Sequence, residues 1–303
     1  MSAIGFVGLG KMGGELARRL LTHRELIVYD VSSAAVERLV GVGAVAAAGP
    51  GELADRCRTI MVCLPKSEDV ERLLFGEASL AGAMRAGDTF VDLTSGDPTI
   101  SRELYEKLNV KGIAFVDAPV SGGVAGAKAG TIAIIVGAPE ELYARIRPVL
   151  ELISLNVFHA GGPGAGHTTK ALNNFLGAGQ RLLTYEAVAL AAMNGIQPER
   201  FIEIINKSSG RTNTSEVTFP RYFFSGNLEM GFSLGLLEKD LSLASKIRPN
   251  PFGEWSTIST VLSFFSKARE ELGPNADINH SISLFEKAGN VAISRRRAIS
   301  EEP

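Results

Sequence analysis

The feature that most constrains this chain is an apolar run that leads straight into a glycine-rich turn. Ile4–Val7 is a short apolar stretch, and Gly8, Gly10 and Gly13 follow it at once with the spacing G-x-G-x-x-G. The next residues have the period of a helix, so the turn joins a strand to a helix N-terminus. In that setting the first glycine permits a tight turn, the second lets a pyrophosphate approach the backbone, and the third lets the helix pack closely on the strand.

The pattern therefore predicts a dinucleotide-binding unit, and the alternative is an ordinary glycine-rich turn with no ligand. The six residues of the turn are the candidate cofactor contacts: Gly8, Leu9, Gly10, Lys11, Met12 and Gly13.

Apolar runs alternate with helical patterns through the first half of the chain. Strands are expected at Ile4–Val7, Leu26–Tyr29, Thr59–Leu64, Thr89–Leu93, Ile113–Val116, Thr131–Val136 and Val157–His159. Helices are expected at Glu15–Leu21, Ser33–Val40, Glu68–Leu74, Ile100–Leu108 and Glu140–Leu150. This alternation predicts βαβ units and a parallel sheet, and strands that are apolar throughout are typical of a sheet covered on both faces. We expect an α/β fold with an N-terminal, doubly wound Rossmann-type domain over residues 1–163.

The composition of the sequence changes after Gly166. Residues 168–194 contain no proline and are rich in alanine and leucine, which predicts one long helix. Further helical patterns follow at Pro198–Asn206, Leu234–Ile247, Trp255–Leu272 and His280–Arg297. We expect an all-helical C-terminal domain over residues 164–303. A long apolar helix in a small domain favours a homodimer or homotetramer formed through that domain.

Asp30 ends the second predicted strand, at the distance from the glycine turn where an acid accepts hydrogen bonds from the 2′-hydroxyl of the adenosine ribose. A carboxylate there would repel a 2′-phosphate, so NAD is favoured over NADP, which remains possible. The alternative is that Asp30 merely caps the next helix, although Ser32 or Ser33 could do so instead.

A second glycine-rich segment, residues 117–131 (DAPVSGGVAGAKAGT), follows a predicted strand. Its exposed backbone N–H groups and hydroxyls could hold a carboxylate at the carboxyl end of the sheet, where ligands of open α/β sheets bind. The alternative is a flexible connection.

Lys170 and Asn174 are four residues apart on the long predicted helix, so they share a face. A lysine beside a desolvated site can exchange protons near neutral pH, whereas an isolated helical lysine more often lies along the surface. The glycine run before it and Asn174 favour the first interpretation. His167 is a second catalytic candidate, but we expect it to contact the backbone or face solvent.

Composition excludes several classes of function. The apolar fraction is 45% and the net charge is −2, so no field attracts nucleic acid or an anionic membrane. Arg295–Arg297 is read as a solvated tail. Cys57 and Cys63 lack the spacing of metal ligands, so we expect no metal and a reducing, cytoplasmic location. We see neither a signal peptide nor a membrane span.

Three segments together resemble the β-hydroxyacid dehydrogenase family over essentially the whole chain. They are DAPVSGGVAGAKAGT, GPGAGHTTKALNN (residues 162–174, with His167 where a glutamine is common) and EKDLSLA (residues 238–244). The resemblance implies that Lys170 is the general acid/base and that Ser121, Gly122 and Gly123 hold a substrate carboxylate with help from Asn174.

The resemblance implies further roles on both sides of the reacting groups. Asp240 would border the substrate, and Lys239 would reach the nicotinamide side. Leu64 and Pro65 would line the cofactor, with Thr94 near the nicotinamide ribose.

The expected reaction is the reversible oxidation of a small 3-hydroxy acid to its semialdehyde with NAD. Hydroxyisobutyrate, glycerate, threonate and serine all fit. The alternatives are an NADP-linked glyoxylate or succinic semialdehyde reductase of the same family, an imine reductase of the same architecture, and a non-catalytic NAD-binding protein.

Overall fold

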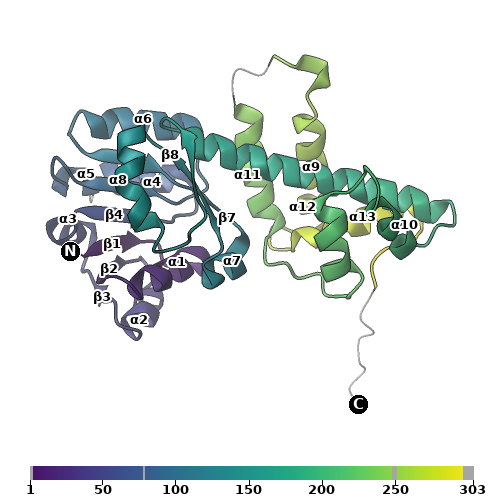
Figure 1. Ribbon diagram of the computed structural model, residues 1–303, viewed down its shortest axis with the longest axis horizontal. Helices are drawn as coiled ribbons and strands as arrows, with labels where there is room; N and C mark the ends of the chain where they lie inside the picture. The colour runs from purple at the N-terminus through teal and green to yellow at the C-terminus, as the bar shows by residue number, and fades with distance from the viewer. Residues whose placement is uncertain (1–2, 78, 248–250, 296–303) are drawn as a thin grey trace. The chain divides into compact units, whose positions relative to one another are not determined.

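The chain forms two compact units, Met1–Lys170 and Ala171–Pro303, in a computed structural model that describes residues 3–77, 79–247 and 251–295 (Figure 1). The first is an α/β unit and the second is helical, as predicted. By this division the first residues of the long helix belong with the α/β unit. The domain boundary between residues 163 and 164 stays a prediction.

One sheet forms the centre of the first unit. Its strands are β1 (Ile4–Val7), β2 (Leu26–Tyr29), β3 (Val45–Ala46), β4 (Thr59–Val62), β5 (Thr89–Asp92), β6 (Ala114–Asp117), β7 (Val120–Ser121), β8 (Ala133–Gly137) and β9 (Val157–Gly161). They lie in the order β3-β2-β1-β4-β5-β6-β8-β7, with β9 beside β8. All pairs from β3 to β6 are parallel, which confirms the doubly wound core. β8 instead runs antiparallel to β6 and β7, so the sheet is not parallel throughout.

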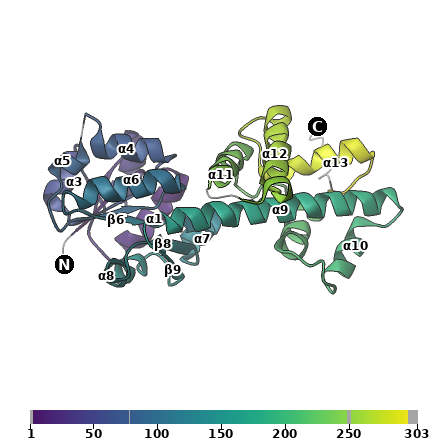
Figure 2. The same ribbon diagram turned by 90° about the horizontal axis from the view of Figure 1, so that it is seen from above.

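Helices cover both faces of this sheet. They are α1 (Lys11–Leu21), α2 (Ser33–Val40), α3 (Pro50–Arg56), α4 (Ser67–Phe75), α5 (Leu80–Ala83), α6 (Pro98–Asn109), α7 (Gly123–Ala129) and α8 (Glu140–Leu150). Alternate strand residues build two cores, one shared with α1, α2, α7 and α8 and the other with α3 to α6. Figure 2 shows α4 and α6 on one side of the sheet and α8 on the other.

The glycine-rich segment after β6 is not the open loop that its composition suggested. It contains strand β7 and helix α7, because the alanines between Gly123 and Gly130 sustain a short helix. Gly130 ends that helix in the left-handed region, with φ of 70°.

The second unit is built along α9 (Ala165–Met193), which has 29 residues. The other elements are α10 (Pro198–Ile205), the wide π-type helix η1 (Thr214–Phe223), α11 (Leu234–Lys246), the 3₁₀ helix η2 (Gly253–Trp255), α12 (Ile258–Leu272), the 3₁₀ helix η3 (Ile278–Ser281) and α13 (Ile282–Gly289). The predicted helices are present, but η1 was not predicted. The predicted last helix is shorter, since α13 ends at Gly289, and Arg296 and Arg297 lie outside the described residues.

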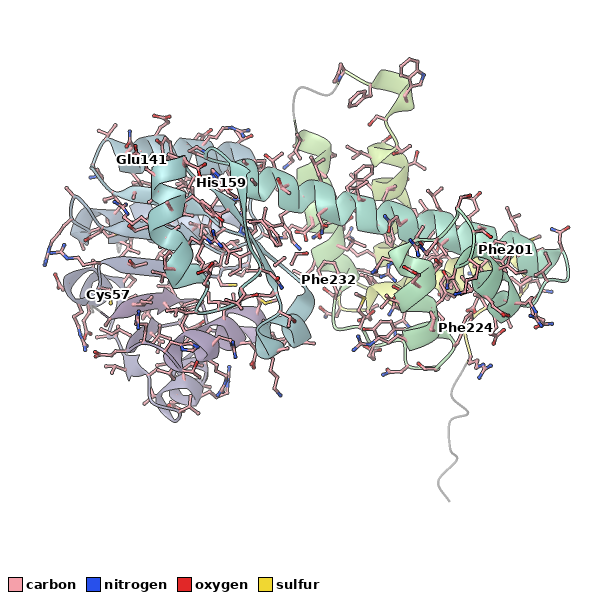
Figure 3. The ribbon with its side chains drawn as sticks, viewed as in Figure 1. Cys57, Glu141, His159, Phe201, Phe224 and Phe232 are labelled. Carbon is pink, nitrogen blue, oxygen red and sulfur yellow. The ribbon has the colours of Figure 1, made fainter. Side chains whose placement is uncertain are left out.

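Two apolar cores lie along α9 in this unit. The first joins α9 to α11 and α12, and the second surrounds Tyr185, whose ring packs edge-on against Phe219 and Phe223 of η1. Phe201 and Phe224, both labelled in Figure 3, pack against this second core. A different face of α9 exposes large apolar side chains: Leu176, Leu183, Leu190 and Met193.

Cys57 and Cys63 form no disulfide, and burial raises the pKa of the Cys57 thiol to about 11. Within the described ranges, every helix is too short or too polar to cross a bilayer.

Candidate active site

The turn after β1 has the geometry that its three glycines predict. Gly8 has a φ of 89°, and a Cβ there would overlap the carbonyl oxygen of Cys63. A Cβ on Gly13 would overlap the carbonyl oxygen of Gly8, so the helix lies directly on the turn. A Cβ on Gly10 would meet no atom within 4 Å. Gly10 therefore keeps open the space in front of the helix N-terminus, where a pyrophosphate binds in this motif.

Asp30 follows β2 and lies against the glycine turn. Its Oδ2 accepts a hydrogen bond from the backbone N of Leu9 at 2.6 Å, and its Oδ1 accepts one from the backbone N of Ser32 at 2.8 Å. The N-cap of α2 is Ser32, whose Oγ accepts from the N of Ala35. Asp30 is therefore not the helix cap, and each of its oxygens keeps a further lone pair for a ribose hydroxyl.

Leu64 and Thr94 meet at the carboxyl ends of the neighbouring strands β4 and β5. The N of Leu64 donates to Thr94 Oγ1 at 3.1 Å, and the N of Thr94 donates to Asp92 Oδ1 at 2.9 Å. Pro65 follows Leu64, three residues after β4 ends at Val62. Leu64 and Pro65, which we expected to line the cofactor, thus lie beside Thr94, which we expected near the nicotinamide ribose.

Lys170 and Ser121 are in direct contact. Lys170 Nζ donates to Ser121 Oγ at 3.2 Å. Gly122 and Gly123 come next in the chain and have φ values of 139° and 68°, in the region that favours glycine. The helix thus brings the predicted proton-transfer group to the predicted carboxylate-holding segment, which are 49 positions apart in the sequence.

His167 is buried. Of the two environments that we expected for it as alternatives, contact with the backbone is the one present, because Nε2 lies 2.8 Å from the carbonyl oxygen of Thr94. Nδ1 lies 2.6 Å from Ser101 Oγ.

The remaining predicted residues form a second group, in the helical unit. Asn174 Nδ2 donates to Asp240 Oδ2 at 2.6 Å, and Lys239 Nζ lies 3.2 Å from Asp240 Oδ1. Asp240 is buried between these partners. Lys170 and Asn174 lie one turn apart on α9, which therefore carries one residue of each group.

Known proteins resemble both units of the chain. Residues 3–161 match the NAD-binding domain of 6-phosphogluconate dehydrogenase, and residues 164–285 match the NAD-binding domain of NADP-dependent 3-hydroxyisobutyrate dehydrogenase. A 2-(hydroxymethyl)glutarate dehydrogenase of Eubacterium barkeri is 38% identical over 292 residues, which cover 96% of this chain and 97% of the relative. A 3-hydroxyisobutyrate dehydrogenase of Pseudomonas aeruginosa is 38% identical, with 80% of this chain and 84% of the relative covered.

The chain belongs to the β-hydroxyacid dehydrogenase family.

Solved structures agree with this assignment. A 3-hydroxyisobutyrate dehydrogenase of Mycobacterium tuberculosis, described with L-serine, has a TM-score of 0.85 and 27% identity, and covers 94% of this chain and 99% of its own. As a member of this family, the protein is an NAD(P)-dependent oxidoreductase that acts on hydroxy acids.

Two buried side chains of this β-hydroxyacid dehydrogenase escaped the sequence-based prediction. Asp117, at the end of β6, accepts hydrogen bonds from the backbone N of Gly164 at 2.8 Å and of His167 at 2.9 Å. Burial raises the pKa of Asp117, while His167 and these two bonds oppose the rise. Ser101, on α6, contacts the His167 ring. An acid directly after an apolar strand was the available signal for Asp117, whereas nothing in the spacing of Ser101 indicated its contact.

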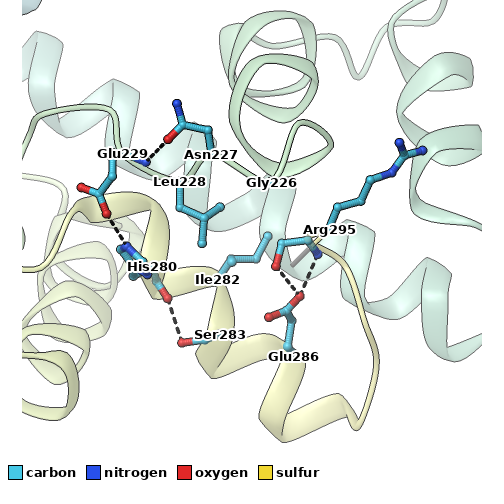
Figure 4. A pocket seen from close by; sticks show the side chains of 10 residues that line it. Gly226, Asn227, Leu228, Glu229, His280, Ile282, Ser283, Glu286 and Arg295 are labelled. Atoms are coloured by element: carbon cyan, nitrogen blue, oxygen red, sulfur yellow. Dashed lines mark hydrogen bonds and ion pairs between the residues drawn. The ribbon is translucent and has the colours of Figure 1, made fainter. Parts of the chain in front are cut away.

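The helical unit also contains a pocket. That pocket, of about 420 Å³, is lined by residues near Gly226–Glu229, His280–Glu286 and Ser294–Arg295 (Figure 4). Glu286 there accepts hydrogen bonds from the backbone N of Ile293 and of Ser294 and fixes the described end of the chain. The predicted site residues are absent from this lining.

No group of three or more His, Cys, Asp or Glu side chains in the described part of the chain is arranged to hold a metal ion. The contact at Lys170 instead joins an ammonium group to the Ser121 hydroxyl, next to the backbone of Gly122 and Gly123. These groups suit a carboxylate and an alcohol.

Proposed function

We propose that the protein interconverts a small 3-hydroxy acid and its semialdehyde, with NAD preferred over NADP and Lys170 as the general acid/base. The contact between Lys170 Nζ and Ser121 Oγ, at 3.2 Å, carries this proposal. It sets a cation that can exchange protons beside a hydroxyl and a glycine-rich turn suited to a carboxylate.

The cofactor half of the site is assigned to the glycine turn, Asp30, Leu64, Pro65, Thr94 and Lys239. The open space at Gly10 fits a pyrophosphate, and the carboxylate of Asp30 fits an unphosphorylated ribose. When bound, the nicotinamide accepts or returns the hydride of the alcohol carbon.

The substrate half is assigned to Ser121, Gly122, Gly123, Asn174 and Asp240. The turn at Ser121–Gly123 holds the carboxylate, which fixes the distance to the hydroxyl. Lys170 takes the hydroxyl proton during oxidation and returns it during reduction, and its cation stabilises negative charge on that oxygen.

The printed names of the relatives support the substrate class. Both 2-(hydroxymethyl)glutarate and 3-hydroxyisobutyrate carry a hydroxymethyl group on the carbon next to a carboxylate. A site built from one carboxylate-holding turn and one lysine recognises that shared part and leaves the rest of the substrate open. We therefore expect activity on several 3-hydroxy acids of this pattern, including serine.

Lys170→Ala tests the proton-transfer role. We expect kcat to fall by about 10³-fold, since the proton acceptor and its charge are both lost, while NADH binding measured by fluorescence titration is retained. Lys111→Ala, at an exposed lysine outside the site, is the matched control and should keep wild-type kcat. A near-normal kcat in Lys170→Ala would exclude this role.

The cofactor preference is tested by the ratio of kcat/KM with NAD to kcat/KM with NADP. We expect the wild type to favour NAD, and Asp30→Asn to lower the ratio by at least about tenfold because the repelling charge is removed. Ser32→Ala, which removes the cap of α2 and keeps the charge, is the control. A wild type that prefers NADP would contradict the preference for NAD and agree with the NADP dependence of the 3-hydroxyisobutyrate dehydrogenase that residues 164–285 match.

We further propose a homodimer or homotetramer formed through the helical unit. The exposed apolar face of α9, with Leu183 68% and Leu190 53% exposed, supports it because such a face gains stability when a second copy covers it. Neither Cys57 nor Cys63 forms a disulfide, which suits a reducing compartment, and we propose a cytoplasmic location on that ground.

A further inference from the structure

His167 joins two parts of the first unit through its ring. Its Nε2 lies 2.8 Å from the carbonyl oxygen of Thr94, and its Nδ1 lies 2.6 Å from Ser101 Oγ. A carbonyl oxygen only accepts, so Nε2 carries the hydrogen of that bond. The ring is almost fully buried, so neither contact competes with bulk water.

Thr94 is held at every polar atom that it has. Its N donates to Asp92, its Oγ1 accepts from the N of Leu64, and its carbonyl oxygen accepts from His167. The first two bonds tie Thr94 to the ends of β4 and β5. Only the third ties it to the segment that carries Lys170.

The backbone of His167 is held just as firmly. Its N donates to the buried carboxylate of Asp117 at 2.9 Å, in the first turn of α9. A Cβ on Gly166 would overlap the backbone oxygen of Ile135, so this turn lies directly on the sheet. Lys170 follows three residues later, on the next turn of the same helix.

We propose that His167 is a positioning residue that fixes the backbone at Thr94 relative to the helical turn carrying Lys170. This rests on the proposed function, in which Thr94 borders the nicotinamide ribose and Lys170 moves the proton. The hydride and the proton leave the same alcohol, so Thr94, beside the hydride acceptor, and Lys170, the proton acceptor, must keep a constant separation. The bond from Nε2 to Thr94 is the link that sets it, and Ser101 holds the ring at the angle that this bond requires.

The length of the side chain offers a matched pair of variants. The amide nitrogen of glutamine extends as far from the backbone as Nε2, so His167→Gln can keep the bond to Thr94. The amide of asparagine ends near the position of Nδ1, so His167→Asn can contact Ser101 but cannot reach Thr94. Both variants are uncharged amides, and they differ in reach by one methylene group.

The kinetic experiment measures single-turnover hydride transfer in these variants with a 3-hydroxy acid that the wild type oxidises. We expect His167→Asn to lose about 10²-fold in the rate, the cost of a misplacement near 1 Å, and His167→Gln to stay within about fivefold of wild type, since it removes no bond to Thr94. Ser101→Ala should fall between them. His23→Asn, at an exposed histidine, should match wild type.

A second measurement needs no substrate and so separates this proposal from the proposed function. Amide hydrogen exchange around Thr94 should speed up in His167→Asn and stay slow in His167→Gln. Equal rates and equal exchange in the two variants would overturn the proposal. The proposal would also be overturned if the loss of rate in each variant simply followed the fall in its melting temperature. A merely structural role would not distinguish glutamine from asparagine.

Discussion

Gly10 and Gly13 lie in the same turn, yet a methyl group has room at only one of them. A Cβ on Gly13 would overlap the carbonyl oxygen of Gly8, whereas one on Gly10 would meet open space. Gly13 therefore serves the fold, and Gly10 serves the proposed cofactor.

The two alanine variants should therefore fail in different ways. We expect Gly13→Ala to lower the free energy of unfolding by about 2–3 kcal/mol, since backbone must move to admit the methyl group. Gly10→Ala should keep wild-type stability and raise the NADH dissociation constant at least about tenfold, because the methyl group occupies the space for the pyrophosphate. Urea unfolding and fluorescence titration measure the two effects. Equal stability losses in both variants would contradict this division.

Single residues were predictable where a local rule sets their environment. The glycine spacing and the place of Asp30 after a strand both follow such rules, and the structure has the expected turn and begins α2 after Ser32, its N-cap. His167 was harder, because its burial depends on Thr94 and Ser101, which are 73 and 66 positions away. Helical period carries no information about contacts of that range.

At the scale of elements, apolar alternation predicted most strands and helices, and the misses have physical causes. Helix α7 looked like a loop because glycines flank and interrupt its alanines. The antiparallel direction of β8 depends on the short return through β7, which periodicity does not encode. Helix η1 contains a proline and has π-type hydrogen bonding, so its apolar residues do not follow a period of 3.6.

The start of α9 gives an element-scale prediction about pH. Burial raises the pKa of Asp117 above its ordinary value of 3.8. Between the ordinary pKa of the unfolded chain and the raised pKa of the native state, the native state therefore binds more protons than the unfolded state. The contribution of Asp117 to stability is then largest at low pH and declines as the pH rises through the raised pKa. Asp92 adds to the rise, and His167 opposes it.

Asp117→Asn should expose this dependence. The amide keeps one acceptor for the helix start but turns its NH₂ toward the second backbone donor, which we expect to cost about 1–3 kcal/mol. The difference in unfolding free energy between wild type and variant should narrow as the pH rises above 3.8, the ordinary pKa that the folded Asp117 exceeds. Urea unfolding over a series of pH values measures it, and a difference that stays constant with pH would contradict a raised pKa.

At the scale of the whole molecule, the division into an α/β unit and a helical unit followed from the change in composition after Gly166. The exposed apolar face of α9 was also expected in outline, since a helix so rich in leucine cannot bury every face in a small unit.

That face predicts the assembly state. We expect the wild type to be a dimer or tetramer by light scattering, and the double variant Leu183→Glu/Leu190→Glu to dissociate, because buried carboxylates without partners would replace apolar contacts. Leu155→Glu is the control, since Leu155 is 82% exposed in the other unit. An unchanged mass in the double variant would place the interface elsewhere.

The close approach of Asp117 to its neighbouring strand restricts how this chain can drift in sequence. A Cβ on Gly137, which pairs with Asp117 across β6 and β8, would collide with the Asp117 carboxylate. A larger residue at position 137 thus fits only after Asp117 has been replaced by a residue with a shorter side chain. That replacement removes the carboxylate that accepts hydrogen bonds at the start of α9. We therefore expect any replacement of Gly137 to be tolerated only together with a change at Asp117.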